Sequence, residues 1–133
     1  MNDMTDYMPG LERVRTRFLS MLEERQGRIA AHALAAWDAE TVEGVNGNLA
    51  GARDILHQIS GTAGALGFQD LGKNARDCEG AIIDHLEGPD ADLAICPGNL
   101  ISMLDSFNSD CRDLLAECRE NIFADEPEDA LAT

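Results

Sequence analysis

Residues 56–67 read LHQISGTAGALG, and the two sides of this stretch differ so clearly that it predicts a helix with one buried face. Successive helical residues are about 100° apart, so positions three, four and seven apart share a face. One face gathers the residues that we expect in the core: Ala52, Ile55, Ile59, Thr62, Ala63 and Leu66. His57 falls on the other face, and its neighbours one and two turns away are Ala50, Arg53, Gly61 and Gly64. The pattern predicts an outward imidazole on a surface nearly bare of side chains.

The glycines beside His57 are unfavourable in a helix. Gly61 and Gly64 each lower helix stability by about 1 kcal/mol relative to alanine. A histidine alone on a helix surface is usually an ordinary surface residue, but two glycines at this spacing favour another interpretation. We infer that Gly61, Gly64 and the neighbouring Ala65 leave room for a second molecule to approach His57.

The chain before this stretch predicts one long amphipathic helix. Apolar residues recur every three or four positions from Leu11 to Trp37, which is about 27 residues or roughly 40 Å of helix. The apolar stripe consists of Leu11, Val14, Phe18, Met21, Leu22, Ile29, Ala33, Ala36 and Trp37. Residues 1–9 are expected to form a short leading turn that Pro9-Gly10 closes.

The helix that carries His57 is expected to span residues 42–66. Thr41 is the expected N-cap residue, and Asn46 or Asn48 is the alternative. Gly67 suits the left-handed position that often follows a helix, so it should end this one.

Two further helices follow. The third is expected over Phe68–Glu87, where Gly88-Pro89 stops it, and Pro97 suits the first turn of the fourth. Their inner residues are Phe68, Leu71, Ala75, Cys78, Ile82 and Leu86, then Leu100, Leu104, Phe107, Cys111, Leu114, Cys118 and Ile122. The short connection at residue 67 folds the third helix back against the second. The sequence predicts an all-α protein, an antiparallel four-helix bundle in a single domain of residues 1–124, with an acidic disordered tail over residues 125–133.

The composition argues against several classes of function. A formal net charge of −15 is unfavourable for binding nucleic acid or an anionic membrane. No apolar run approaches the roughly 18 residues of a membrane span, and the first ten residues do not resemble a signal peptide, so we expect a cytoplasmic protein. The four cysteines form no C-x-x-C pair and no metal-ligand pattern, which favours reduced thiols. The sequence contains no G-x-x-x-x-G-K-[ST] nucleotide-binding motif.

The stretch around His57 resembles the signature of histidine-containing phosphotransfer (HPt) domains, His-x-x-Lys-Gly-x-Ala/Ser-x-x-Leu/Val-Gly. The matching residues are His57, Gly61, Ala63, Leu66 and Gly67. Leu71 and Glu79 stand where the next helix of that family places a core leucine and a polar partner for the histidine. Ser60 departs from the pattern, because the family usually has a lysine there.

This resemblance implies a phosphorelay intermediate with no turnover of its own. His57 would accept a phosphoryl group, and Glu79 would orient its imidazole. Response-regulator receiver domains, and a hybrid histidine kinase, would be the partners; the receiver would bring the phospho-aspartate and Mg²⁺, so the chain needs no cofactor of its own. The partner-binding residues would be Ala50, Arg53, Ser60, Gly61, Gly64, Lys73 and Arg76.

Two other interpretations remain open. One is a helical docking module that regulates a kinase or receiver without carrying phosphate, which the missing lysine at Ser60 favours and the intact His57 disfavours. The other is a helical-bundle metalloprotein, but no glutamate stands three residues before His32, His57 or His85, as such sites require. We assign no function to His32 or His85, and we expect no metal site.

Overall fold

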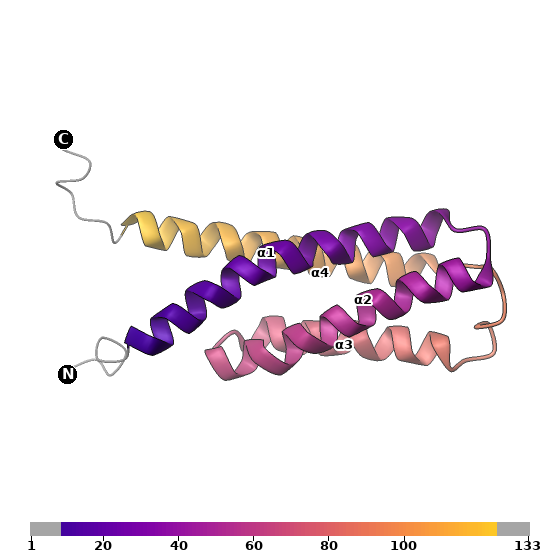
Figure 1. Ribbon diagram of the computed structural model, residues 1–133, viewed down its shortest axis with the longest axis horizontal. Coiled ribbons are helices and arrows are strands. Elements are labelled where there is room, and N and C mark those ends of the chain that lie inside the picture. The colour runs from indigo at the N-terminus through magenta and orange to yellow at the C-terminus, as the bar shows by residue number, and fades with distance from the viewer. Residues whose placement is uncertain (1–8, 125–133) are drawn as a thin grey trace.

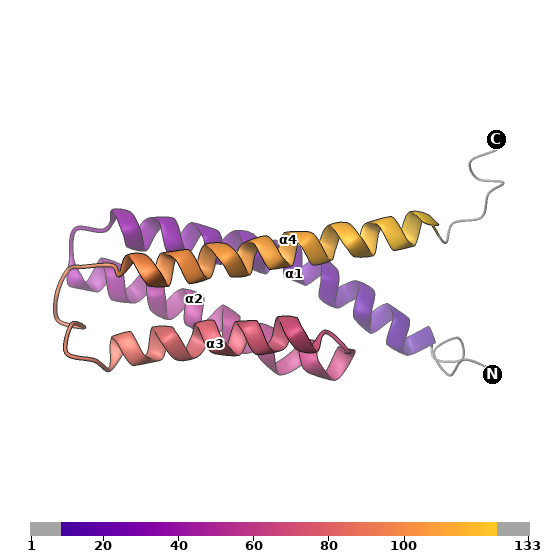
Figure 2. The same ribbon diagram turned by 180° about the vertical axis from the view of Figure 1, so that it is seen from behind.

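The computed structural model describes residues 9–124, which form four α-helices (Figure 1). These are α1 (Pro9–Asp38), α2 (Val42–Ala63), α3 (Gln69–Leu86) and α4 (Gly98–Ala124), with one 3₁₀ turn, η2 (Gly64–Leu66), at the end of α2. Each helix packs on its neighbours in chain order, and α4 closes the ring on α1. Figures 1 and 2 show the α1–α4 pair on one side of the molecule and the α2–α3 pair on the other. The expected antiparallel four-helix bundle is confirmed.

The core is formed by the apolar stripes of all four helices. Its largest fully buried side chains include Leu22, Ile29, Leu49, Leu56, Ile59, Ile82, Leu104 and Phe107. The prediction was wrong at the margins of the α1 stripe, because Val14, Met21 and Trp37 are exposed. The apolar stripe of α1 is wider than the surface that α2 and α4 can cover. Thr62 is also exposed, and its hydroxyl donates to the Gln58 carbonyl at 3.1 Å, so it belongs to the polar side of α2.

The ends of α1 and α2 agree with the sequence except at two places, the start of α1 and the end of α2. Pro9 and Gly10 begin α1 and do not close a separate turn, which fits the tolerance of proline in a first helical turn. Thr41 is the N-cap residue of α2, since its Oγ1 accepts a hydrogen bond from the Gly44 amide at 3.0 Å. The α-helix ends at Ala63, three residues early, because the chain tightens into η2 before Gly67.

The α2–α3 connection is held by specific contacts. Gly67 adopts a φ of 94°, the left-handed conformation that glycine tolerates best, and its amide donates to the Gly64 carbonyl at 3.2 Å. Phe68 stacks on Phe18 with ring centroids 5.4 Å apart. Arg15 Nε donates to the Leu66 carbonyl at 3.1 Å. These contacts tie the turn to α1 and fix the register in which α3 returns along α2.

The last two helices are close to their predicted limits. Phe68 and Glu87 flank α3 and do not lie within it. In α4 the predicted seam holds as far as Cys111; beyond it Leu115 is buried, while Leu114 and Cys118 are only half-buried. The side chain of Ile122, the leading residues 1–8 and the predicted tail 125–133 lie outside the described residues. Between residues 9 and 124, no helix is both long and apolar enough to span a bilayer.

Candidate functional site

His57 stands on the outer surface of the bundle, near the middle of α2. Its neighbours Leu56 and Ile59 are fully buried, whereas the His57 side chain is 75% exposed. The division follows directly from the helical period, because the core residues of α2 occupy the opposite face. The predicted outward imidazole is therefore present.

Glu79 on α3 lies against the imidazole. The two atoms His57 Nδ1 and Glu79 Oε2 are 2.8 Å apart, and the carboxylate side chain is only 16% exposed. His57 and Glu79 lie eleven residues before and eleven residues after Phe68, so the antiparallel return of α3 brings them opposite each other. The resemblance predicted that Glu79 would lie against His57, and the structure has this contact.

The contact determines which ring nitrogen is reactive. An ionised carboxylate only accepts hydrogen bonds, so Nδ1 of His57 carries the proton and donates it to Glu79. The lone pair of a neutral imidazole then resides on Nε2. The site therefore presents a nucleophilic nitrogen whose ring is oriented from behind by a mostly buried carboxylate.

The surface around His57 is open where the glycine pattern predicted it. A Cβ atom added at Gly61 or at Gly64 would meet no atom within 4 Å, so nothing in the fold requires glycine at either place. Gly51 differs, because a Cβ atom there would come within 2.7 Å of the His32 ring. Gly72 of α3 is also a packing glycine, since its Cβ would lie 3.3 Å from the Gly64 amide nitrogen. Gly61 and Gly64 are therefore free to serve a partner, and Gly47 of α2 and Gly80 of α3 are equally open.

The remaining residues of the predicted partner surface differ in the contacts that they make. Arg53 forms an ion pair with Asp54 at 3.1 Å, and Lys73 of α3 pairs with Asp77 at 2.9 Å. The hydroxyl of Ser60 donates to the backbone carbonyl of His57 at 3.0 Å, so it points back at the helix. Of the other two residues in the predicted partner surface, Ala50 is half-buried and Arg76 is exposed.

The other histidines have structural surroundings. His32 Nδ1 lies 3.0 Å from Asn48 Oδ1, a contact that joins α1 to α2. The Nε2 atom of His85 is buried and has no hydrogen-bond partner among the described residues. Neither residue shares the exposed, carboxylate-backed position of His57.

The cysteines are free thiols, as expected. Burial, reinforced by the nearby Asp77, raises the pKa of Cys78 to about 11. Burial raises the pKa of Cys111 to about 12, with Asp110 adding to the effect. Both groups therefore stay protonated at neutral pH and are poor nucleophiles. No group of three His, Cys, Asp or Glu side chains within residues 9–124 is arranged to hold a metal ion.

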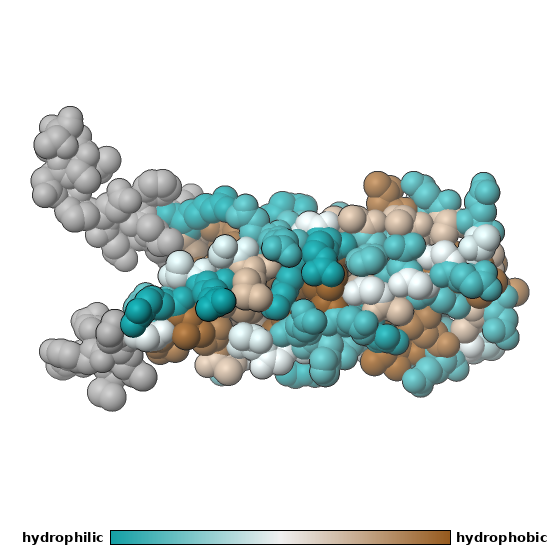
Figure 3. Space-filling model, in the orientation of Figure 1, coloured by the Kyte–Doolittle hydropathy of each residue, from teal (hydrophilic) through white to brown (hydrophobic). Residues whose placement is uncertain are grey.

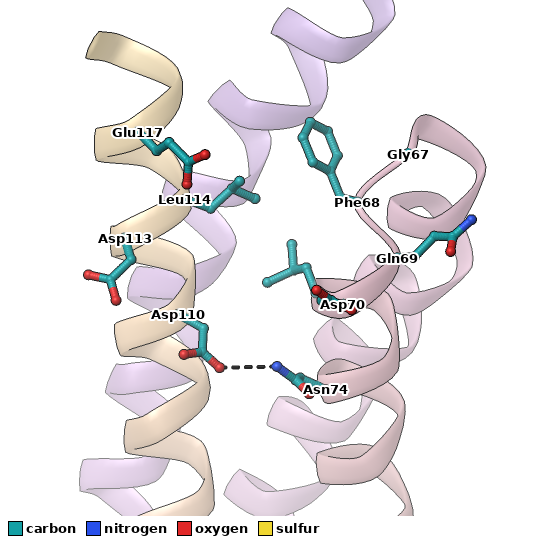
Figure 4. Close-up of a pocket in the computed structure, with 10 residues that line it drawn as sticks. Gly67, Phe68, Gln69, Asp70, Asn74, Asp110, Asp113, Leu114 and Glu117 are labelled. Atoms are coloured by element: carbon teal, nitrogen blue, oxygen red, sulfur yellow. Dashed lines mark hydrogen bonds between the residues drawn. The ribbon is translucent and has the colours of Figure 1, made fainter. Parts of the chain in front are cut away.

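An acidic hollow that was not predicted from the sequence lies between the start of α3 and α4. Figure 4 shows Asp110, Asp113 and Glu117 along α4, with Asp110 and Glu117 pointing toward α3, where Asp70 lies, and Asp113 pointing away from it. The hollow has a volume of about 390 Å³, and Asn74 Nδ2 donates to Asp110 Oδ2 across it at 3.2 Å. The spacing of the three α4 carboxylates predicts a common face, but Asp70 joins them only through the tertiary fold. His57 does not line this hollow.

Comparisons of the chain with protein-family models, with curated proteins and with solved structures gave no match. The function must therefore be inferred from the geometry around His57 and from the motif that surrounds it.

Proposed function

We propose that this protein is a phosphorelay intermediate of the HPt type, which accepts a phosphoryl group on His57 from a receiver-domain phospho-aspartate and passes it to another response regulator. The observation that carries the proposal is the His57–Glu79 pair. An imidazole that is 75% exposed is held at 2.8 Å by a carboxylate that is 16% exposed. Beside the pair are Gly61 and Gly64, at which an added Cβ would meet open space.

The chemistry follows from the protonation of the ring. The lone pair of His57 Nε2 attacks the phosphorus of the acyl phosphate, and the phosphorus–oxygen bond to the partner's aspartate breaks. The bonding electrons leave with the aspartate carboxylate. The imidazole keeps its proton on Nδ1 and becomes positively charged, and the Glu79 carboxylate offsets this charge. Onward transfer to a second receiver is the reverse of the same step.

The receiver domain would supply what this chain lacks. In-line phosphoryl transfer needs charge neutralisation around the phosphate oxygens, and the receiver would bring Mg²⁺ for this purpose. The partner surface would comprise the open side of α2 with Lys73 and Arg76 of α3. The carrier would act in the cytoplasm, where its free thiols stay reduced, and it would not turn over substrate by itself.

One observation favours the second candidate, a docking module that binds a receiver or kinase without carrying phosphate. The family lysine is replaced by Ser60, whose hydroxyl is engaged with the His57 carbonyl and not with the space above the imidazole. Such a module would bind receivers but take up no label.

Transfer of labelled phosphate separates the two candidates. The full chain is incubated with acyl-phosphorylated receiver domains, and label on the chain is tested for lability in acid and stability in base. We expect phosphohistidine on the wild type and none on His57→Gln, with helicity unchanged. His32→Gln and His85→Gln serve as matched controls and should be labelled normally. Receiver binding without label on the wild type would establish the docking module.

A further inference from the structure

A groove between α1 and α4 lies on the side of the bundle away from the α2–α3 pair that carries His57. Its volume is about 580 Å³. Six of its lining residues carry the inference: Ala33, Leu34, Trp37, Ile101, Asp105 and Asn108. We name this surface the α1–α4 groove. At the upper edge of Figure 3, apolar side chains stand out over the C-terminal half of α1 among hydrophilic neighbours.

The groove exposes side chains that folding normally buries. Leu34 is 63% exposed and Trp37 is 56% exposed, and both lie beside Ile101. The floor contains Asn108, which is 3% exposed. Its Oδ1 atom is buried and has no hydrogen-bond partner among the described residues. What the groove offers a partner is therefore apolar contact, because this oxygen lies below the accessible surface.

The charged and aromatic groups of the groove are complementary to a positive charge. Asp105 contributes a carboxylate and is the one charged side chain among the lining residues. The exposed indole of Trp37 provides the aromatic face that attracts cations most strongly. The chain as a whole carries a net charge of −15. A basic partner therefore fits this surface far better than an acidic one.

The dimensions fit two to three turns of helix. The lining runs from Ala30 to Trp37 on α1, about 10 Å, and from Gly98 to Asn108 on α4, about 15 Å. An amphipathic helix that docks in a groove uses apolar anchors at positions i, i+3 or i+4, and i+7, which also span about 10 Å.

The rest of this chain is a poor occupant. Leu34 and Trp37 lie roughly 40 Å along α1 from Pro9, whereas eight extended residues reach at most about 29 Å. Residues 125–133 carry four carboxylates and would meet Asp105 with like charge. A second copy of this strongly acidic chain meets the same repulsion.

We propose that the α1–α4 groove docks a basic amphipathic helix of another protein. Leucine-like anchors of that helix pack on Leu34, Trp37 and Ile101, and a lysine or arginine reaches Asp105. This inference does not depend on phosphotransfer at His57. Because the groove and His57 lie on different helix pairs, both can be occupied at once.

The test uses the full chain and a capped 14-residue peptide of leucine, lysine and alanine, with leucines at i, i+3, i+4 and i+7. A peptide of the same composition with its leucines spread around the helix is the control. Trp37 is the chain's one tryptophan, so its fluorescence reports on the groove directly. We expect saturable binding of the amphipathic peptide with a shift of the emission to shorter wavelength.

Variants locate the binding. Leu34→Asn should weaken it about tenfold, as loss of an anchor does, while Val14→Asn, also on α1 and 50% exposed, should leave it unchanged. Asp105→Asn should weaken binding about threefold at low salt and less at high salt. Equal binding of both peptides, or equal affinity of the Leu34 and Val14 variants, would overturn the proposal. So would a wild-type dimer that Leu34→Asn dissociates, since the groove would then hold a second copy.

Discussion

Replacing Glu79 by alanine should slow phosphoryl uptake by His57 while leaving the bundle folded. The carboxylate is the partner of His57 Nδ1 at 2.8 Å. Without it, the exposed ring rotates more freely and exchanges between its two neutral tautomers. Only rings that present the Nε2 lone pair toward the receiver react, so the reactive fraction falls.

The magnitude follows from the exposure of the two groups. A hydrogen bond to a charged group contributes about 1.5–3 kcal/mol. Glu79 is mostly buried but the His57 imidazole is 75% exposed, so solvent screening lowers the value to about 1 kcal/mol. Because about 1.4 kcal/mol corresponds to a tenfold change in rate, uptake should slow about fivefold. Glu79→Gln keeps an oxygen acceptor but loses the charge, and we expect a loss of about twofold.

The assay is single-turnover transfer from an acyl-phosphorylated receiver, with thermal unfolding measured alongside. Nitrogen NMR of the His57 ring gives the tautomer independently of the rate. The wild type should show a protonated Nδ1, and Glu79→Ala should show an average of both tautomers. Asp84→Ala, which removes an exposed carboxylate of the same helix, is the control. An unchanged rate with unchanged ring-nitrogen shifts would refute the orienting role of Glu79.

Three further predictions concern the surroundings of His57. Gly61→Leu should abolish transfer while the melting temperature holds, because a Cβ atom added there meets no atom within 4 Å in the free protein; normal transfer would contradict the close approach. Gly72→Leu should instead lower the free energy of unfolding by about 1–3 kcal/mol or more, because a Cβ there already lies 3.3 Å from the backbone of η2; an unchanged denaturation midpoint would contradict this packing. Arg53→Ala should lower the yield of phospho-His57 severalfold, and Ser60→Lys in that background should restore it; equal yields in all variants would assign charge neutralisation entirely to the receiver.

The helical period alone identified the face on which His57 lies, since burial on a helix is decided locally by spacings of three and four residues. The same reasoning failed at Met21 and Trp37, which have core-like spacing on α1 but are exposed. Periodicity shows which residues can be buried, and the neighbouring helices decide which ones are. The α1–α4 groove could not be predicted for this reason.

The pairing of His57 with Glu79 was predicted only through the family resemblance. Its physical basis is the symmetry of the two positions about Phe68. That symmetry has meaning only once the turn at Gly67 and the return direction of α3 are known. The roles of the α2 glycines also depend on the tertiary fold. Gly51 makes room for the His32 ring of α1, and no local sequence pattern distinguishes Gly51 from Gly61.

If His57 carries a phosphoryl group as proposed, Ser60, which stands where the HPt signature has lysine, changes where the phosphoryl charge must be stabilised. In the free protein the Ser60 hydroxyl is bonded to the His57 carbonyl and Arg53 is paired with Asp54. Arg53 can leave its exposed partner at a cost of at most about 1 kcal/mol, so it can contribute, but only weakly. A further contribution within this chain would be the charge that Glu79 places behind a phosphorylated ring, which would act on the imidazole and not on the phosphate oxygens. A carrier built in this way would hold its phosphoryl group loosely in isolation and would bind it well only while a receiver supplies the cation. Such a balance would favour onward transfer over storage, which is the property that the proposed function requires.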